Sequence, residues 1–399
     1  MNLHSAALPD LLVVDLSRVL AGPYCTMILA DLGAQVLKIE VPGRGDDTRQ
    51  WGPPFAGGEA AYYLSVNRGK KSLTLNLKTE TGREILRELA RRADVLVENF
   101  RVGTMEEWGL GYKDLQAINP GLIYCAITGY GQDGPYRDRP GYDFIIQAQG
   151  GIMSITGPVE GPPMKVGVAI VDITAGLYAA VGILAALHER QRSGQGQFID
   201  IALLDAQVAW LANVGSNYLV SGEKPRRYGN AHANIVPYEP FPTRDGWIAI
   251  AVGNDRQWQQ LCALAGWEDL AADPRFTTNP LRVENREVLV PILQERFCQE
   301  TSQVWEEKLL AAGIPCAPIQ TIDQVFADPQ VLARGMLVEL PHPTAGTVRL
   351  AGSPLKLSRT PVQLTEPPPL LGQHTAEVLA TYLGYGPEQI ARLRDEGVI

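Results

Sequence analysis

The first third of the chain alternates between strand-like and helix-like patterns, and this alternation limits the possible folds more than any other feature. The strand-like segments are short runs rich in apolar and β-branched residues, at 11–17, 35–41, 71–77, 94–100 and 122–131. Helical patterns lie between them at 22–34 and 82–93, and Thr81 with Glu84 forms a capping-box pattern at the second. Strands that alternate with helices predict an α/β domain with a doubly wound, mostly parallel sheet.

Basic and amide side chains follow several of these strands. In a doubly wound sheet, ligands bind beyond the carboxyl ends of the strands. Arg18, Arg44, Asn99 and Arg101 fall at such ends in the sequence. We therefore expect these side chains near a bound ligand.

The character of the sequence changes after Ser221. Before it, 198–205 has a strand pattern and 206–220 a helical one, whereas the following stretch to Phe241 is rich in turn formers and indicates a linker or an active-site loop. Later patterns predict a strand at 247–253, helices at 255–266, 284–300 and 302–313, short strands at 347–352 and 354–358, and helices at 375–384 and 386–396. Residues 225–325 are the candidate second domain. The pattern alone leaves open whether the C-terminal segment rejoins the first domain.

Asp172 stands at a seam between two patterns. Residues 166–171 are small and β-branched, as in a strand, and 173–188 are apolar at helical spacing. A carboxylate here would cap the helix, where the macrodipole favours negative charge. We therefore expect Asp172 to stay ionised, as a nucleophilic carboxylate must. Taken alone, the segment favours a simple helix cap over a nucleophile.

Composition excludes several classes of protein. The net charge of −9 argues against a nucleic-acid surface. The five cysteines never form a CxxC spacing and the five histidines are isolated, so we expect neither disulfides nor a metal site. The longest apolar run, Ile173–Leu187, is too short for a membrane span, and no signal-peptide pattern opens the chain. These features predict a soluble, cytoplasmic protein without a membrane partner.

Six different motifs follow one another along nearly the whole chain: DLSRVLAGPYCTMILADLGAQVLKIEVPGRGDDTR (15–49), NRGKKSLTLNLKTETG (67–82), DVLVENFR (94–101), GYGQDGPY (129–136), GYDFIIQAQGG (141–151) and LLGQHTAEVL (370–379). Together with the Asp172 segment, they resemble the family III CoA-transferases, the family of formyl-CoA transferase and the carnitine CoA-transferases. The resemblance implies a large Rossmann-like domain of residues 1–220 that residues 326–399 rejoin, a smaller α+β domain at 225–325, and an interlocked homodimer.

The resemblance also implies a chemistry. Family members use an aspartate at the Asp172 position as acyl acceptor, first as an anhydride and then as a CoA thioester. The substrates would be an acyl-CoA and a small carboxylic acid, with no permanently bound cofactor. Because every attacking group is already an anion, no general base is needed, which agrees with the lack of a histidine-centred triad.

By the same resemblance, the expected CoA-binding residues are Arg18, Leu75, Lys78, Asn99, Phe100, Arg101 and Tyr142. Lys70 and Lys71 are further candidates for contacts with the CoA phosphates. The chain departs from the family pattern at Leu20, Val41 and Glu107, which argues against oxalate or formate chemistry.

The loop at the start of the candidate second domain indicates the substrate class. Around 225–240, Arg227, His232 and Asn234 could meet a second carboxylate, and this stretch is similar to the succinyl-CoA-dependent dicarboxylate CoA-transferases. A carnitine-type or aromatic acceptor is the alternative. A 2-methylacyl-CoA racemase would share the fold, but its GHD motif is Gly141-Tyr142-Asp143 here, and tyrosine is a poor proton shuttle. A nucleotide-binding protein that has lost the chemistry is a third possibility.

Overall fold

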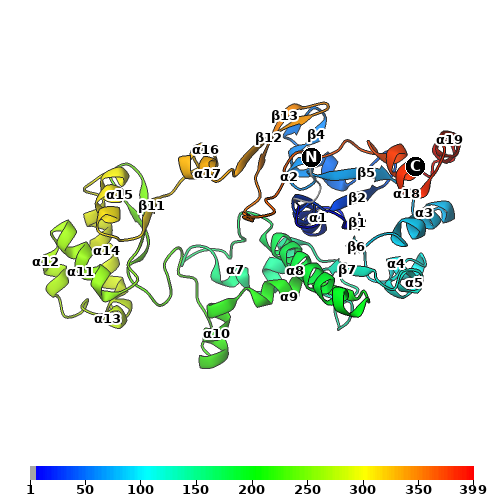
Figure 1. The fold of residues 1–399 in the computed structure, drawn as a ribbon. Helices are drawn as coiled ribbons and strands as arrows, with labels where there is room; N and C mark the ends of the chain where they lie inside the picture. Colours follow the sequence, from blue (N-terminus) through cyan, green and yellow to red (C-terminus); the bar gives the residue numbers. More distant parts are fainter. Residues whose placement is uncertain (1–5) are drawn as a thin grey trace. The chain divides into compact units, whose positions relative to one another are not determined.

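A parallel sheet of six strands organises the N-terminal part of the protein (Figure 1). The computed structural model describes residues 6–399. In spatial order the strands are β5 (Lys70–Thr74), β2 (Gln35–Glu40), β1 (Leu12–Asp15), β6 (Val95–Glu98), β7 (Ile123–Thr128) and β8 (Phe198–Ala202). Every neighbouring pair is parallel. Counted along the chain, this is the order 3-2-1-4-5-6 of doubly wound sheets, so the predicted α/β fold is confirmed.

Helices cover both faces of this sheet. Side chains of successive strand residues point to opposite faces, so they pack in two different apolar clusters. Val13 and Val36 pack in the cluster that includes α1 (Ala21–Asp31) and α8 (Ile170–Ser193). Val14 and Leu37 pack in the opposite cluster, with α3 (Glu80–Ala90), α18 (Thr375–Leu383) and α19 (Pro387–Asp395). Both faces of the strands are therefore buried, as expected for a parallel sheet.

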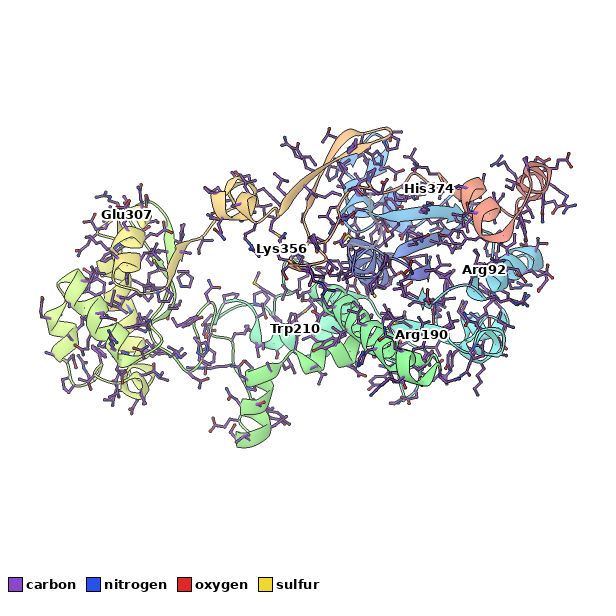
Figure 2. The ribbon with its side chains drawn as sticks, viewed as in Figure 1. Arg92, Arg190, Trp210, Glu307, Lys356 and His374 are labelled. Atoms are coloured by element: carbon purple, nitrogen blue, oxygen red, sulfur yellow. The ribbon has the colours of Figure 1, made fainter. Side chains whose placement is uncertain are left out.

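The C-terminal segment completes the edge of the sheet beside β5. The His374 backbone N–H donates to the carbonyl of Ser72 (2.9 Å), and the Asn76 N–H donates to the carbonyl of Val398 (2.8 Å). The Thr74 N–H donates to Thr375 Oγ1 (3.1 Å). Figure 2 labels His374 at the start of α18, next to the sheet. Residues more than three hundred positions apart in the sequence thus lie side by side.

The chain divides into two units. Unit 1 holds the sheet and comprises the residues up to Gly151, Val166–Gly215 and Pro329–Ile399. Unit 2 comprises Ile152–Lys165 and Ser216–Asp328. The remaining elements of unit 1 are η2 (Asp47–Gln50), β3 (Phe55–Ala56), β4 (Glu59–Ala60), α2 (Ala61–Ser65), α4 (Thr104–Glu107), α5 (Tyr112–Ile118), α6 (Asp143–Gln149), α9 (Leu203–Ala209), α17 (Pro329–Ala333), β12 (Leu337–His342) and β13 (Gly346–Ala351). Helix α10 (Ala212–Ser221) carries the chain from one unit to the other.

Unit 2 has a core of its own around an antiparallel sheet. Its strands are β9 (Tyr238–Pro242), β10 (Trp247–Ala251) and β11 (Cys316–Pro318), with β10 in the centre. Its helices are α7 (Ile152–Ile155), α11 (Asp255–Ala265), α12 (Glu268–Ala272), α13 (Asn279–Glu284), α14 (Arg286–Phe297), α15 (Ser302–Ala311) and α16 (Ile322–Ala327). Phe241, Trp258 and Phe297 are fully buried in this core.

Several local predictions are wrong. Residues 166–169 form no strand. The Val166 N–H donates to Gln147 Oε1 (2.9 Å) and, further on, the Val171 N–H donates to Asp143 Oδ1 (2.8 Å), so both groups bond to side chains and not to a neighbouring strand. Helix α3 is capped by Thr79, whose Oγ1 accepts the Gly82 N–H, and not by Thr81. Residues 354–358 form no strand, and 206–220 is interrupted between α9 and α10.

Helix α8 is longer than the apolar run suggested. Within residues 6–399, it is the helix whose length and composition would allow a membrane span, so the expectation that it is too short is wrong. This evidence is weak, since a core helix of a soluble protein has the same properties. One side of α8, including Val171, Ala175, Ala179 and Ile183, is buried in unit 1. The helix is therefore part of that unit's core.

Candidate active site

The candidate site lies where the strand order reverses, between β1 and β6. The chain leaves the carboxyl end of β1 at Leu16 and that of β6 at Asn99. Ligands of doubly wound proteins bind in the crevice at this point. Two cavities open there, of about 390 and 430 Å³.

The first cavity, here called the Asp172 pocket, contains most of the residues expected to bind CoA. Its lining includes Arg18, Val19, Leu20, Asn99, Phe100, Arg101, Arg137, Arg139, Gly141, Tyr142 and Asp172. The second, the Leu75 pocket, is lined by residues that include Arg18, Lys38, Val41, Asp46, Leu75, Lys78, Phe100 and Trp108. Arg18 and Phe100 line both cavities. The structure therefore brings the predicted unit 1 residues to two adjoining pockets.

His232 and Asn234 are not among these residues. Both lie in unit 2, where the His232 Nδ1 accepts the Asn234 N–H (3.1 Å) and the ring packs beside Tyr238. Arg227 donates to the carbonyls of Pro158 and Gly161 in the same unit.

Asp172 occupies the first turn of α8, after the N-cap residue Ala169. Burial raises the pKa of its carboxyl to about 7, and the neighbouring Asp143 carboxylate contributes to the rise. The expectation that the helix dipole keeps Asp172 fully ionised is therefore wrong, because loss of solvation and a like charge outweigh the dipole. Asp143 is held in place by the Val171 N–H (2.8 Å) and the Gln147 amide (2.7 Å). A carboxylate with a pKa near neutrality and a like-charged neighbour is typical of a reactive group.

Asn99 uses its side chain to hold the loop after β1. Its Oδ1 accepts the Arg18 N–H (2.9 Å), and its Nδ2 donates to the Arg18 carbonyl (2.7 Å). The Arg18 guanidinium donates to Asp47 (3.0 Å) and lies 5.8 Å from the centre of the Phe100 ring. Its buried Nε has no partner in the part of the chain that the structure describes.

The two lysines considered for phosphate binding have other partners. Lys70 is buried, and its Nζ donates to Asp15 (3.1 Å), Asn67 Oδ1 (3.0 Å) and the Pro23 carbonyl (2.9 Å). The hypothesis that Lys70 binds a phosphate is therefore wrong. Lys71 forms a surface ion pair with Glu377 (2.6 Å) and lines neither pocket.

Sequence reasoning missed Arg137 and Arg139, which also line the Asp172 pocket. Arg139 stacks on the Tyr136 ring, with its guanidinium carbon 3.7 Å from the ring centre. The signal was available, since the run Tyr136–Tyr142 follows the carboxyl end of β7. With Arg18 and Arg101, these side chains give the pocket four arginines, which suits a ligand that carries several negative charges.

A doubly wound domain with a buried aspartate and four arginines in a cavity at its switch point is typical of an enzyme that acts on an anionic substrate. Comparison with known proteins identifies the kind of enzyme. The family model described as CoA-transferase family III matches residues 8–375. The chain belongs to this family and is an enzyme that transfers CoA, with CoA thioesters as substrates.

Individual relatives agree with this assignment. The chain is similar to the succinyl-CoA:glutarate CoA-transferase of Homo sapiens, with 46% identity over 387 residues, 97% of this chain and 88% of the relative. It is similar to the succinate–glutarate CoA-transferase of Agrobacterium fabrum, with 48% identity covering 92% of this chain and 94% of the relative. A crystal structure of a CAIB/BAIF family protein from Brucella suis matches with a TM-score of 0.85 and 47% identity, over 93% of this chain and 98% of that one.

Proposed function

We propose that the enzyme transfers CoA from succinyl-CoA to a dicarboxylic acid, of which glutarate is the first candidate, through covalent intermediates on Asp172. The observation that carries the donor and acceptor is the identity of 46–48% to transferases named for succinyl-CoA or succinate and glutarate. The position of Asp172 in an arginine-lined cavity supports its role as the nucleophile.

The proposed reaction begins when the Asp172 carboxylate attacks the thioester carbonyl of the donor. The C–S bond breaks, CoA leaves as the thiolate, and an aspartyl–succinyl anhydride forms. The thiolate then attacks the aspartyl carbonyl of the anhydride, which releases succinate and leaves an aspartyl-CoA thioester. The acceptor carboxylate attacks that thioester, the C–S bond breaks, and CoA thiolate leaves a second anhydride between Asp172 and the acceptor. The thiolate then attacks the acceptor carbonyl of this anhydride, which forms the new acyl-CoA and releases the Asp172 carboxylate. Each nucleophile is an anion, so no step needs a proton.

We propose that the two pockets share the CoA molecule. The Leu75 pocket combines apolar side chains with Lys78, which suits an adenine and its phosphates. Arg18 lines both pockets, so it would contact the part of the CoA molecule that connects the nucleotide to the thioester. Arg101, Arg137, Arg139 and Tyr142 would surround the reacting end. Unit 1 would thus be the CoA-binding domain.

Unit 2 would supply recognition of the acceptor. We propose that His232 and Asn234, with Arg227 nearby in sequence, meet the second carboxylate of the dicarboxylic acid. The argument is chemical: an imidazole, an amide and a guanidinium are donors that suit a carboxylate. A carnitine-type acceptor would offer a quaternary ammonium instead, for which these groups are poorly suited.

A panel of acids tests the proposed substrates. We expect the protein with succinyl-CoA to form new acyl-CoA species with glutarate and other dicarboxylates, detected by mass spectrometry, and much less with monocarboxylates of equal length. Transfer only to monocarboxylates or to carnitine-like acids would contradict the dicarboxylate proposal. Exchange of the α-hydrogen of a 2-methylacyl-CoA with deuterated water, without any transfer, would instead favour the racemase.

We also propose a cytoplasmic homodimer in which the free side of α8 is covered. Leu177, Tyr178, Val181 and Leu184 are between 37% and 63% exposed on that side, opposite the buried stripe. A helix that is apolar all round needs cover on all sides. We expect sedimentation equilibrium to give twice the mass of one chain, and Val181→Lys to shift the protein towards monomer. A wild-type monomer at micromolar concentration would contradict the proposal.

A further inference from the structure

The turn that connects β1 to α1 holds a valine in an unfavourable backbone conformation. Val19 has φ 71°, in the left-handed region. A β-branched residue rarely adopts this conformation, because its side chain clashes with its own backbone. Such a conformation persists only where the surrounding structure enforces it, and it is often found at functional sites.

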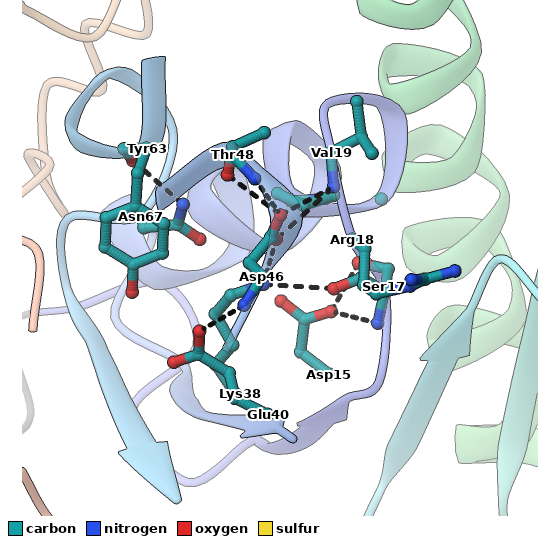
Figure 3. Close-up of polar contacts among 12 residues, drawn as sticks. Asp15, Ser17, Arg18, Val19, Lys38, Glu40, Asp46, Thr48, Tyr63 and Asn67 are labelled. Carbon is teal, nitrogen blue, oxygen red and sulfur yellow. Dashed lines mark hydrogen bonds and ion pairs between the residues drawn. The ribbon is translucent and has the colours of Figure 1, made fainter. Parts of the chain in front are cut away.

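Three side chains from other segments, those of Asp46, Lys38 and Asn99, hold this turn; Figure 3 shows Asp46 and Lys38. The Val19 N–H donates to both carboxylate oxygens of Asp46, at 3.3 Å each. The Lys38 ammonium donates to the carbonyl of Ser17 at 3.0 Å. The Asn99 amide holds both backbone groups of Arg18. The conformation of the turn is therefore fixed by contacts from outside it.

Asp46 is the group that connects these contacts. Its side chain is fully buried, and besides Val19 it accepts the Lys38 ammonium (2.9 Å), the Thr48 N–H (3.0 Å) and the Thr48 hydroxyl (2.8 Å). Burial alone would raise the pKa of Asp46, but Lys38 and Thr48 more than offset this and hold the pKa below its ordinary value. Asp46 is thus a carboxylate that stays charged and is satisfied on both oxygens.

The turn is also where the two pockets meet. Val19 and Leu20 line the Asp172 pocket, Asp46 lines the Leu75 pocket, and Arg18 lines both. A change of the Val19 φ would rotate the peptide units on either side and move Arg18 and Leu20 together. Whatever fixes this residue therefore fixes the boundary between the pockets.

We propose that Asp46 is a positioning residue for CoA transfer: by holding Val19 in the left-handed conformation, it keeps Arg18 and Leu20 where the two halves of the CoA molecule need them. This inference rests on the proposed function of the two pockets. It assigns to a buried carboxylate that does not line the Asp172 pocket a role in catalysis that acts through the backbone.

The first test compares Asp46→Asn with Asp31→Asn. Asp31 is a matched control, because it is equally buried and forms a two-pronged ion pair with Arg68 (2.8 and 2.7 Å) in the same unit but lines neither pocket. Both variants should lose similar thermal stability. Asp46→Asn should lower kcat/KM for the acyl-CoA at least about tenfold below that of Asp31→Asn, as small misplacements near a reaction do. Equal kcat/KM values for the two variants at equal melting temperature would overturn the proposal.

The second test asks whether Asp46 acts through Val19. Glycine adopts positive φ without strain, so Val19→Gly should reduce the need for the Asp46 contact. The loss of kcat/KM caused by Asp46→Asn should be at least about threefold smaller in the Val19→Gly background than in the wild type, which is the size expected of coupled neighbours. Independent, multiplicative effects in this cycle would overturn the proposal.

Binding of CoA alone, measured by calorimetry, separates this inference from the proposed function. Should the wild type bind CoA but transfer it to no acid, the proposed reaction fails, and weaker CoA binding by Asp46→Asn than by Asp31→Asn still supports the positioning role. Equal binding by both variants in that case overturns it.

Discussion

Replacing Asp172 by alanine is expected to abolish CoA transfer, with a fall in kcat of at least about 10⁴-fold, the size typical for loss of a covalent nucleophile. The Asp172→Ala variant should bind CoA with nearly unchanged affinity, because it keeps the arginines and the Leu75 pocket that we propose for CoA binding. Steady-state assays and calorimetry measure the two quantities separately. A large loss of CoA affinity would show instead that Asp172 is a structural residue.

Chemical trapping identifies the intermediate itself. Hydroxylamine or borohydride, added to the wild type mixed with its donor, should modify a single peptide at Asp172. Asp205→Ala is the matched control, since Asp205 also lies in the first turn of a helix, α9, but outside the Asp172 pocket. That variant should keep both the modification and the activity. Near-normal turnover of Asp172→Ala would mean that the covalent mechanism is wrong.

The rate of transfer is expected to depend strongly on pH. The pKa of Asp172 is raised to about 7, and only the ionised form attacks the thioester. Activity should therefore be full above pH 8 and fall as the pH drops through 7, by about tenfold per unit, to about a hundredth near pH 5. The pH profile of kcat/KM for the acyl-CoA, which reports the groups of the free enzyme, tests this where the protein stays folded. A profile that is flat down to pH 5 would contradict the raised pKa.

Asp143 supplies the matched variant for this prediction. Asp143→Asn removes the like charge that contributes to the raised pKa of Asp172, so the inflection should move to lower pH while burial keeps it above the ordinary value. Glu98 also titrates in this range, because burial raises its pKa to about 8. Glu98→Gln should leave the inflection near pH 7 in place, which assigns that inflection to Asp172.

The sequence predicted the sheet well because its strands carry their own signal. Strands β1, β6 and β7 are runs of mainly apolar residues. The residues that follow such strands fall at the ligand-binding edge of the sheet, which is why the sequence pointed to Arg18 and Asn99. The ordered motifs identified the family, and the resemblance to that family suggested Asp172 as the nucleophile. Both kinds of evidence are local in the chain.

What could not be predicted depends on partners distant in the sequence. In the segment 35–41, Lys38 and Glu40 alternate with apolar residues as solvent-facing positions do, yet both are buried in ion pairs with Asp46 and Arg49. The small and β-branched residues at 166–171 suggested a strand, but side chains of α6 accept the N–H groups of Val166 and Val171. The raised pKa of Asp172 likewise follows from burial and, second, from Asp143, which no spacing rule connects to it.

The pairing of β5 with the C-terminal segment has a consequence for synthesis on the ribosome. Thr375, the partner of Thr74, lies 301 residues further along the chain. At ordinary elongation rates, it is synthesised roughly 15–60 s after Thr74. During that interval the nascent chain has an uncovered sheet edge of the kind that joins strands of other molecules. Unit 2 is made entirely within the same interval, so it can fold first. We therefore expect molecular chaperones to bind mainly to unit 1 of the nascent chain.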